Sequence, residues 1–180
     1  MKFGEVKDKL IEFVSPYYAS RDIMHNMQHI ELVSKSVDVI LGLVNYAVNL
    51  DFIRYATYFH GVVLDNEQDV KAWLEKQGLL ETDINIIIQI ALESQRYATP
   101  KTIEGKILHD AHIIEGGKAY AITKCLTTGA LRGQTLNETV AIMETIFAKS
   151  KCYLPEVVPL FKEYNAFAKE FVADLKLGTQ

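Results

Sequence analysis

The chain has 180 residues, enough to bury a hydrophobic core, and its 49% hydrophobic and 23% charged residues are typical of a globular protein. A net charge of −4 leaves no strongly basic surface of the kind that nucleic-acid-binding proteins use. The two cysteines, Cys125 and Cys152, lie far apart without CxxC spacing, which excludes zinc-ribbon and thioredoxin-like sites. With no signal peptide and no membrane-length apolar run, we expect one cytoplasmic domain spanning residues 1–180.

Apolar residues recur at helical spacing through nearly the whole chain and no segment alternates like a strand, so the sequence predicts an all-α bundle. A first helix is expected to stop at Ser15-Pro16, because the residue before a proline disfavours helical geometry. A second helix should run from about His25 to Val48. A third, from Phe52 to Val63, can be capped by Asn49 or, more strongly, by Asp51. Its sequence is apolar nearly all round, which is typical of the centre of a bundle.

The second half continues the helical pattern. Asp65-Asn66-Glu67 begins a short helix, which Gly78 ends, and Thr82-Asp83 opens the next one. Thr102 is predicted to cap a further helix, which Gly116-Gly117 ends.

A helix through about Leu126 and a loop at Gly129–Gly133 should follow. Thr135 and Glu138 fit a capping box, and the last helix should run from about Pro155 to Leu175.

Histidines and one aspartate stand out among the apolar segments. His25 and His29 are four residues apart and share a helix face, although no glutamate follows His25 as in the zincin motif. His60 ends an apolar helix, where a buried imidazole needs a partner. Asp110 lies between apolar neighbours and needs a cation, a metal or backbone donors. These residues are open to two interpretations, ordinary satisfied side chains or a metal site built from three segments.

The order of these residues resembles the HD-domain superfamily of all-α metal-dependent phosphohydrolases, in particular the small bacterial stand-alone members. His25-Asn26-Met27-Gln28-His29 resembles their His-Asp-x-x-His turn, and Ala56–Val63 resembles their Ala-Leu-Phe-His-Asp segment. Ile107–Gly117 resembles their Gln-Asp-Ala-Asp-Arg-Leu-Asp-x-Gly segment. The similarity covers most of the chain.

Several positions depart from that pattern. Gly61 replaces the aspartate that names the family, and His112 replaces the second acid of the Asp-Ala-Asp segment. Asn26 stands where relatives often have aspartate, and no histidine occurs near Glu93-Ser94-Gln95, where many relatives have one.

The resemblance implies a divalent metal ion (Mn, Co, Mg, Ni or Zn) held by His29, His60 and Asp110. It implies His25 or Asp65 as the proton acceptor in catalysis. Three protein ligands plus water is a common catalytic zinc arrangement, and two histidines with one carboxylate suit other divalent ions. Arg21, Arg96 or Lys101 would neutralise the phosphate.

Three functions remain open from the sequence. The first is a metal-dependent phosphohydrolase of nucleotide-like phosphate substrates. The second, suggested by Gly61, is a catalytically inactive HD-fold module that binds a ligand or a protein partner. The third is a helical scaffold, which would leave His60 and Asp110 unexplained. No membrane partner is expected.

Overall fold

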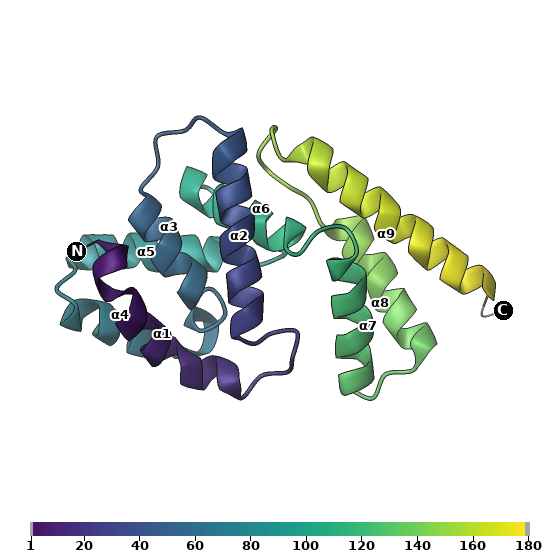
Figure 1. The fold of residues 1–180 in the computed structure, drawn as a ribbon, viewed down its shortest axis with the longest axis horizontal. Helices are drawn as coiled ribbons and strands as arrows, with labels where there is room; N and C mark the ends of the chain where they lie inside the picture. The colour runs from purple at the N-terminus through teal and green to yellow at the C-terminus, as the bar shows by residue number, and fades with distance from the viewer. Residues whose placement is uncertain (1, 179–180) are drawn as a thin grey trace.

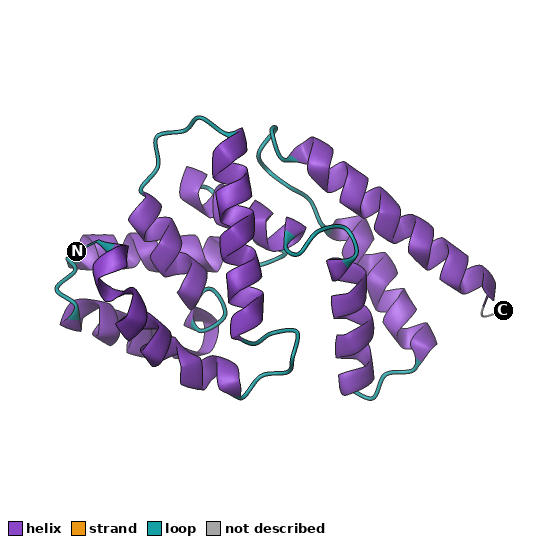
Figure 2. Cartoon of the chain, in the orientation of Figure 1, coloured by secondary structure: helices purple, strands orange, loops and turns teal. Residues whose placement is uncertain are grey.

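A computed structural model describes residues 2–178, and the regular structure in this range is entirely helical (Figures 1 and 2). The predicted all-α fold class is therefore confirmed. The described residues form nine helices: α1 Phe3–Ala19, α2 Met27–Leu43, α3 Leu50–Phe59, α4 Val63–Lys76, α5 Glu81–Glu93, α6 Ile103–Ile114, α7 Tyr120–Leu131, α8 Leu136–Lys149 and α9 Val158–Gly178.

Helices α1 to α6 form the main body, with α3 near its centre (Figure 1). Six of the ten residues of α3 are buried, because its sequence is apolar nearly all round. It packs against α1, α2, α5 and α6, and α6 also packs against α2 and α5. The C-terminal end of α3 therefore lies inside the body, beside two other helices that carry histidines.

The structure differs from the sequence prediction at one proline, at one helix end and at one helix cap. Helix α1 continues through Pro16 to Ala19, because packing of its buried apolar stripe outweighs the backbone hydrogen bond that proline cannot make. Helix α2 ends earlier than predicted, at Leu43. The side chain of Asn49 caps α3, whereas Asp51 accepts a hydrogen bond from the backbone N–H of Phe3 at 3.1 Å.

Three predicted caps and turns are confirmed. The Thr102 side chain caps α6, and Thr135 and Glu138 form a capping box at α8. Gly116 follows α6 with a φ of +66°, and a Cβ atom there would lie 2.4 Å from the Tyr120 ring. This turn requires glycine and separates α6 from α7.

Helices α7, α8 and α9 form a second layer beside the body, with their own apolar cluster (Figure 1). The predicted loop at Gly129–Gly133 is instead partly helical, since α7 extends to Leu131. A Cβ atom at Gly129 would lie 2.2 Å from Thr139 Oγ1, so the glycine allows α7 and α8 to approach closely. In residues 2–178 no helix has both the length and the apolar character needed to cross a membrane.

Candidate metal centre

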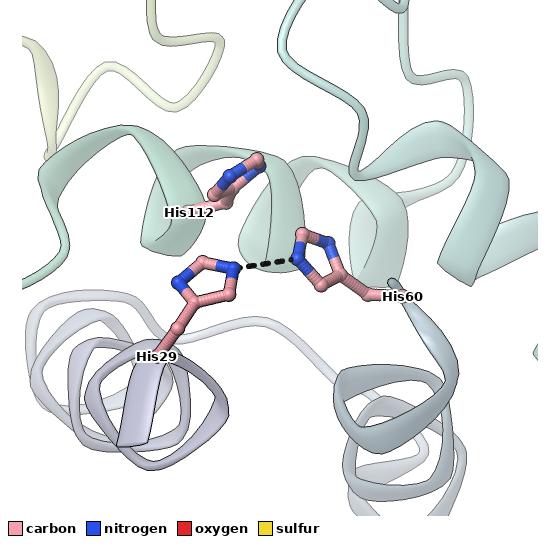
Figure 3. Close-up of side chains that lie close together, drawn as sticks. All are labelled: His29, His60 and His112. Carbon is pink, nitrogen blue, oxygen red and sulfur yellow. Dashed lines mark hydrogen bonds between the residues drawn. The ribbon is translucent and has the colours of Figure 1, made fainter. Parts of the chain in front are cut away.

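Three imidazoles from three helices meet inside the protein (Figure 3). His29 lies in the first turn of α2, whose N-terminus is capped by the Asn26 side chain. His60 is the C-cap of α3, and His112 lies in the last turn of α6. One ring nitrogen of each lies within 4.8 Å of the others, and the Nε2 atoms of His29 and His60 are 3.0 Å apart. Their exposed fractions are only 4%, 4% and 9%.

Ser94, at the end of α5, orients two of the three rings. Its hydroxyl donates to the Ala91 carbonyl at 2.6 Å, so it accepts from Nδ1 of His60 at 3.0 Å. Its backbone carbonyl, which can only accept, lies 3.0 Å from Nδ1 of His112. Both rings therefore carry their proton on Nδ1 and leave Nε2 as a lone pair.

Glu115 does the same for the third ring. Its Oε2 accepts a hydrogen bond from Nδ1 of His29, and its Oε1 accepts one from Nζ of Lys124 at 2.6 Å. Since Nδ1 of His29 donates to a carboxylate, Nε2 of His29 is a lone pair when the ring is neutral. Ligand histidines in metalloproteins have this arrangement, in which the second ring nitrogen donates to a carboxylate or carbonyl.

Burial keeps the three rings in the neutral form that metal binding needs. Desolvation and the neighbouring imidazole of His29 place the pKa of His60 well below its ordinary value. Desolvation and the neighbouring His60 do the same to the pKa of His112. Desolvation also lowers the pKa of His29, although its hydrogen bond with Glu115 acts in the opposite direction.

The ion pair beside the rings is also nearly buried. Burial would raise the pKa of Glu115, but its bond to His29 and the Lys124 ammonium outweigh burial and lower it. Burial lowers the pKa of Lys124, against the effect of Glu115.

The donor set fits a divalent transition-metal ion. Two neutral imidazoles that face each other through Nε2 lone pairs at 3.0 Å repel unless a proton or a cation lies between them. Nitrogens bound to one tetrahedral zinc ion at about 2.0–2.1 Å would be about 3.3 Å apart, so the His29–His60 pair needs only a small adjustment. Three imidazoles with an open fourth position are a known catalytic zinc arrangement.

Asp110, which the sequence placed in the ligand set, is directed elsewhere. Its carboxylate accepts hydrogen bonds from the backbone N–H groups of Tyr153 and Leu154 at 2.8–3.0 Å, and it lies 3.0 Å from Nδ1 of His109. The structure brings together His29 and His60 as expected, with His112 as the third group in place of Asp110. On a helix, positions 110 and 112 point in different directions.

Of the two residues expected to accept a proton, the structure places His25 beside the imidazoles and Asp65 away from them. His25 borders the cavity next to the imidazoles, and its ring centre lies 6.1 Å from that of His29. Its Nδ1 lies 2.8 Å from the Asp22 carboxylate, which leaves Nε2 free. Asp65 is exposed in the first turn of α4 and is not among the residues that line this cavity.

Gly61 has a structural explanation. A Cβ atom at this position would lie 3.0 Å from both Tyr18 and Arg21. The Tyr18 hydroxyl donates to the Tyr58 carbonyl at 2.8 Å and accepts from the Gly61 N–H, while Arg21 donates to the Gly61 carbonyl. These two side chains cover the position after His60, where the HD pattern has the aspartate that Gly61 replaces.

A cavity of about 170 Å³ adjoins the centre, between α6 and the α7–α8 pair. His112 and Glu115 form part of its wall, so the imidazole cluster is accessible from it. Three cationic side chains (Arg96, Lys124 and Arg132) border the cavity, against one acidic side chain, Glu115. Of the cations expected to meet a phosphate, Arg96 is in place, Arg21 is bound to Gly61, and the exposed Lys101 is not in the lining.

Four important residues were missed by sequence reasoning or had no role in it. His112 was noted only as a departure from the family pattern, while Ser94 and Glu115 were given no function. Lys124 carried a usable signal, because a lysine between Ile122 and Leu126 on an apolar helix face is unusual. Nothing in the sequence shows that the carbonyl and hydroxyl of Ser94 orient two different rings.

The comparison with solved structures supports the fold. No protein-family model matches the sequence, and no curated protein matches it significantly. The crystal structure of Bacillus subtilis YpgQ in complex with ADP matches with a TM-score of 0.64 and 17% identity, covering 95% of this chain and 96% of YpgQ. A second crystal structure of B. subtilis YpgQ gives 0.64 and 15%, with coverages of 96% and 97%. At this identity, the likeness shows a shared helical fold.

Proposed function

We propose that this protein is a metal-dependent phosphohydrolase of the HD type that acts on a small, nucleotide-like phosphate substrate. One observation carries the proposal: three buried imidazoles donate through Nδ1 to fixed acceptors, so that their Nε2 lone pairs can share one cation. His29, His60 and His112 are the proposed ligands. Asp110 is left out of this set because its carboxylate is occupied by backbone donors.

A divalent ion held there would supply Lewis-acid activation of water and of a phosphoryl oxygen. His25 would accept a proton at Nε2, because Asp22 fixes the Nδ1 proton of its ring. This role falls to His25 rather than to Asp65, which lies outside the cavity. Arg96 and Lys124 would offset the charge of the substrate.

The substrate class rests on charge and on the structural neighbour. A cavity with three cationic side chains and one carboxylate favours an anion, and its partial enclosure favours a small one. The neighbour YpgQ has been crystallised with ADP, a phosphorylated ligand of this kind.

A second candidate, ligand binding without turnover, is favoured by the surroundings of Gly61. The position of the family's aspartate is covered by Tyr18 and Arg21, and Glu115, the one carboxylate in the cavity wall, is already bound to His29 and Lys124.

Metal analysis and hydrolysis assays on the same samples separate the candidates. We expect purified protein to bind one equivalent of Zn²⁺ or Co²⁺, and the loaded protein to release phosphate from nucleotides. His25→Asn should keep the metal and lose most of the hydrolysis. ADP binding without any phosphate release would favour the binding module, and failure to bind any divalent ion would refute the metal-dependent hydrolase.

A further inference from the structure

Helix α7 presents a row of polar side chains to the cavity. Lys124 and Thr128 lie on one face of α7, Arg132 follows four residues later at its C-cap, and all three line the cavity. At 1.5 Å per residue, the row extends about 12 Å along the helix axis. Side chains on a helix all lean toward its N-terminus, so the three side chains follow one another along the cavity in sequence order. Lys124 is nearest the imidazoles.

Lys124 has donors that no protein group accepts. Its ammonium, in a side chain only 8% exposed, has three N–H groups, and Glu115 accepts one of them at 2.6 Å. Nδ1 of His29, at 3.3 Å, cannot accept because it donates to Glu115, and the Tyr120 ring, whose centre is 5.9 Å from Nζ, offers a cation–π contact rather than an acceptor atom. A nearly buried ammonium with unused donors at a cavity wall indicates an anionic ligand.

Thr128 supplies an independent observation. Its Oγ1 is buried and has no hydrogen-bond partner. Two buried helical threonines, Thr57 and Thr139, donate to the carbonyl four residues earlier, which is the usual solution for a buried hydroxyl. This hydroxyl lies one helical turn from Lys124, in a residue that lines the cavity, and is free to donate to an acceptor from outside the protein.

We propose that this row on α7 binds a chain of at least two linked phosphoryl groups. The phosphoryl group nearest the metal centre accepts hydrogen bonds from Lys124 and Thr128, and the next one pairs with Arg132 at the cavity mouth. A single phosphate is too short to engage both ends of the row. The position of the reacting phosphoryl group beside the metal centre rests on the proposed function. The substrates of the proposed enzyme would then be organic diphosphates or molecules with longer phosphate chains.

The test uses metal-free protein, so that it does not depend on the metal centre or on turnover. Isothermal titration with inorganic pyrophosphate and with orthophosphate should show that pyrophosphate binds at least about tenfold more tightly. Arg132→Gln should remove this preference and leave orthophosphate binding unchanged. Lys124→Gln should weaken both anions by about tenfold or more, and Thr128→Val should weaken both by a smaller factor.

Matched controls come from the same regions. Lys101→Gln removes an exposed cation outside the cavity, and Thr123→Val removes a satisfied hydroxyl from the exposed face of α7. Lys124→Arg, which keeps the charge, should retain most of the affinity and shows whether Lys124→Gln acts only through folding. Equal binding of the two anions to the wild type, or an Arg132→Gln variant that behaves like Lys101→Gln, would overturn the proposal. Failure of hydrolysis or of metal binding would leave these titrations unaffected.

Discussion

Helix α6 carries two buried polar centres within a few residues of each other, and the two differ in whether their polar atoms find hydrogen-bond partners within the protein. Asp110 and His109 are fully buried, and their polar atoms are paired within the protein, with backbone N–H groups, with each other and with the Arg96 carbonyl. His112 and Glu115 are almost as buried, but their hydrogen bonds leave imidazole lone pairs directed at other lone pairs.

The difference separates a structural centre from a candidate functional one. The Asp110 centre links the segment before α9 to α6, and both oxygens of its carboxylate already accept hydrogen bonds. In the proposed function, a cation completes the His112 centre. A buried histidine or aspartate therefore indicates function only when one of its polar atoms has no suitable hydrogen-bond partner within the protein.

The largest expected effect is on the structural centre. Asp110→Ala leaves the N–H groups of Tyr153 and Leu154 without an acceptor, so we expect the free energy of unfolding to fall by about 4 kcal/mol. Urea unfolding measures this change. Metal affinity should stay within about twofold of the wild type. A large loss of metal affinity in a variant that still folds would make Asp110 a ligand, as the sequence suggested.

The matching change in the other centre is His112→Ala. Removing one of three ligands should lower Zn²⁺ affinity by about a hundredfold, measured by competition with a chromogenic chelator. The free energy of unfolding without metal should change little. The His112 ring packs in the interior, which stabilises the fold, but its lone pair faces the other imidazoles, which destabilises it. Unchanged affinity would show that His112 is only a packed core residue.

The apo protein should lose stability in mild acid. The pKa values of His60 and His112 are lowered in the fold, whereas the unfolded chain takes up these protons near pH 6.5. Stability is therefore retained above that pH and lost as the pH falls below it, by about 2 kcal/mol between pH 6.5 and 5.5.

Denaturant unfolding in a chelator at several pH values measures this loss. His112→Ala should reduce this dependence but not abolish it, since His29 and His60 remain as buried imidazoles with lowered pKa values. A stability that does not vary over this interval would contradict the burial of neutral rings.

The smallest effect concerns ring orientation. Ser94→Ala removes the acceptor of the His60 Nδ1 proton but keeps the backbone carbonyl that orients His112. We expect a loss of about tenfold in metal affinity. Ser36→Ala, a buried serine of α2, is the control and should leave affinity unchanged. Equal effects in the two variants would show that Ser94 acts only through packing.

The sequence predicted the helical fold and two of the three imidazoles, for identifiable reasons. Apolar periodicity survives in every helix, and His29 and His60 occur at a helix start and a helix end, where few orientations are available. The third ligand was assigned to Asp110 because an acid in an apolar segment is conspicuous. Which of residues 110 and 112 faces the other histidines depends on the rotation of α6, and both flanks of that helix are apolar.

The residues that orient the imidazoles could not be predicted at all. Glu115 lies at the C-cap of α6 and meets Lys124 only through the Gly116 turn, and Ser94 reaches His60 across 34 residues. Such pairs depend on how helices pack, which single-sequence periodicity does not specify.

The most direct test is a crystal structure of the Zn²⁺-loaded protein, with anomalous diffraction recorded at the zinc edge. The structure predicts one peak at about 2.0–2.1 Å from a ring nitrogen of each of His29, His60 and His112. A peak bound by the Asp110 carboxylate, or no peak among the three rings, would contradict the central claim.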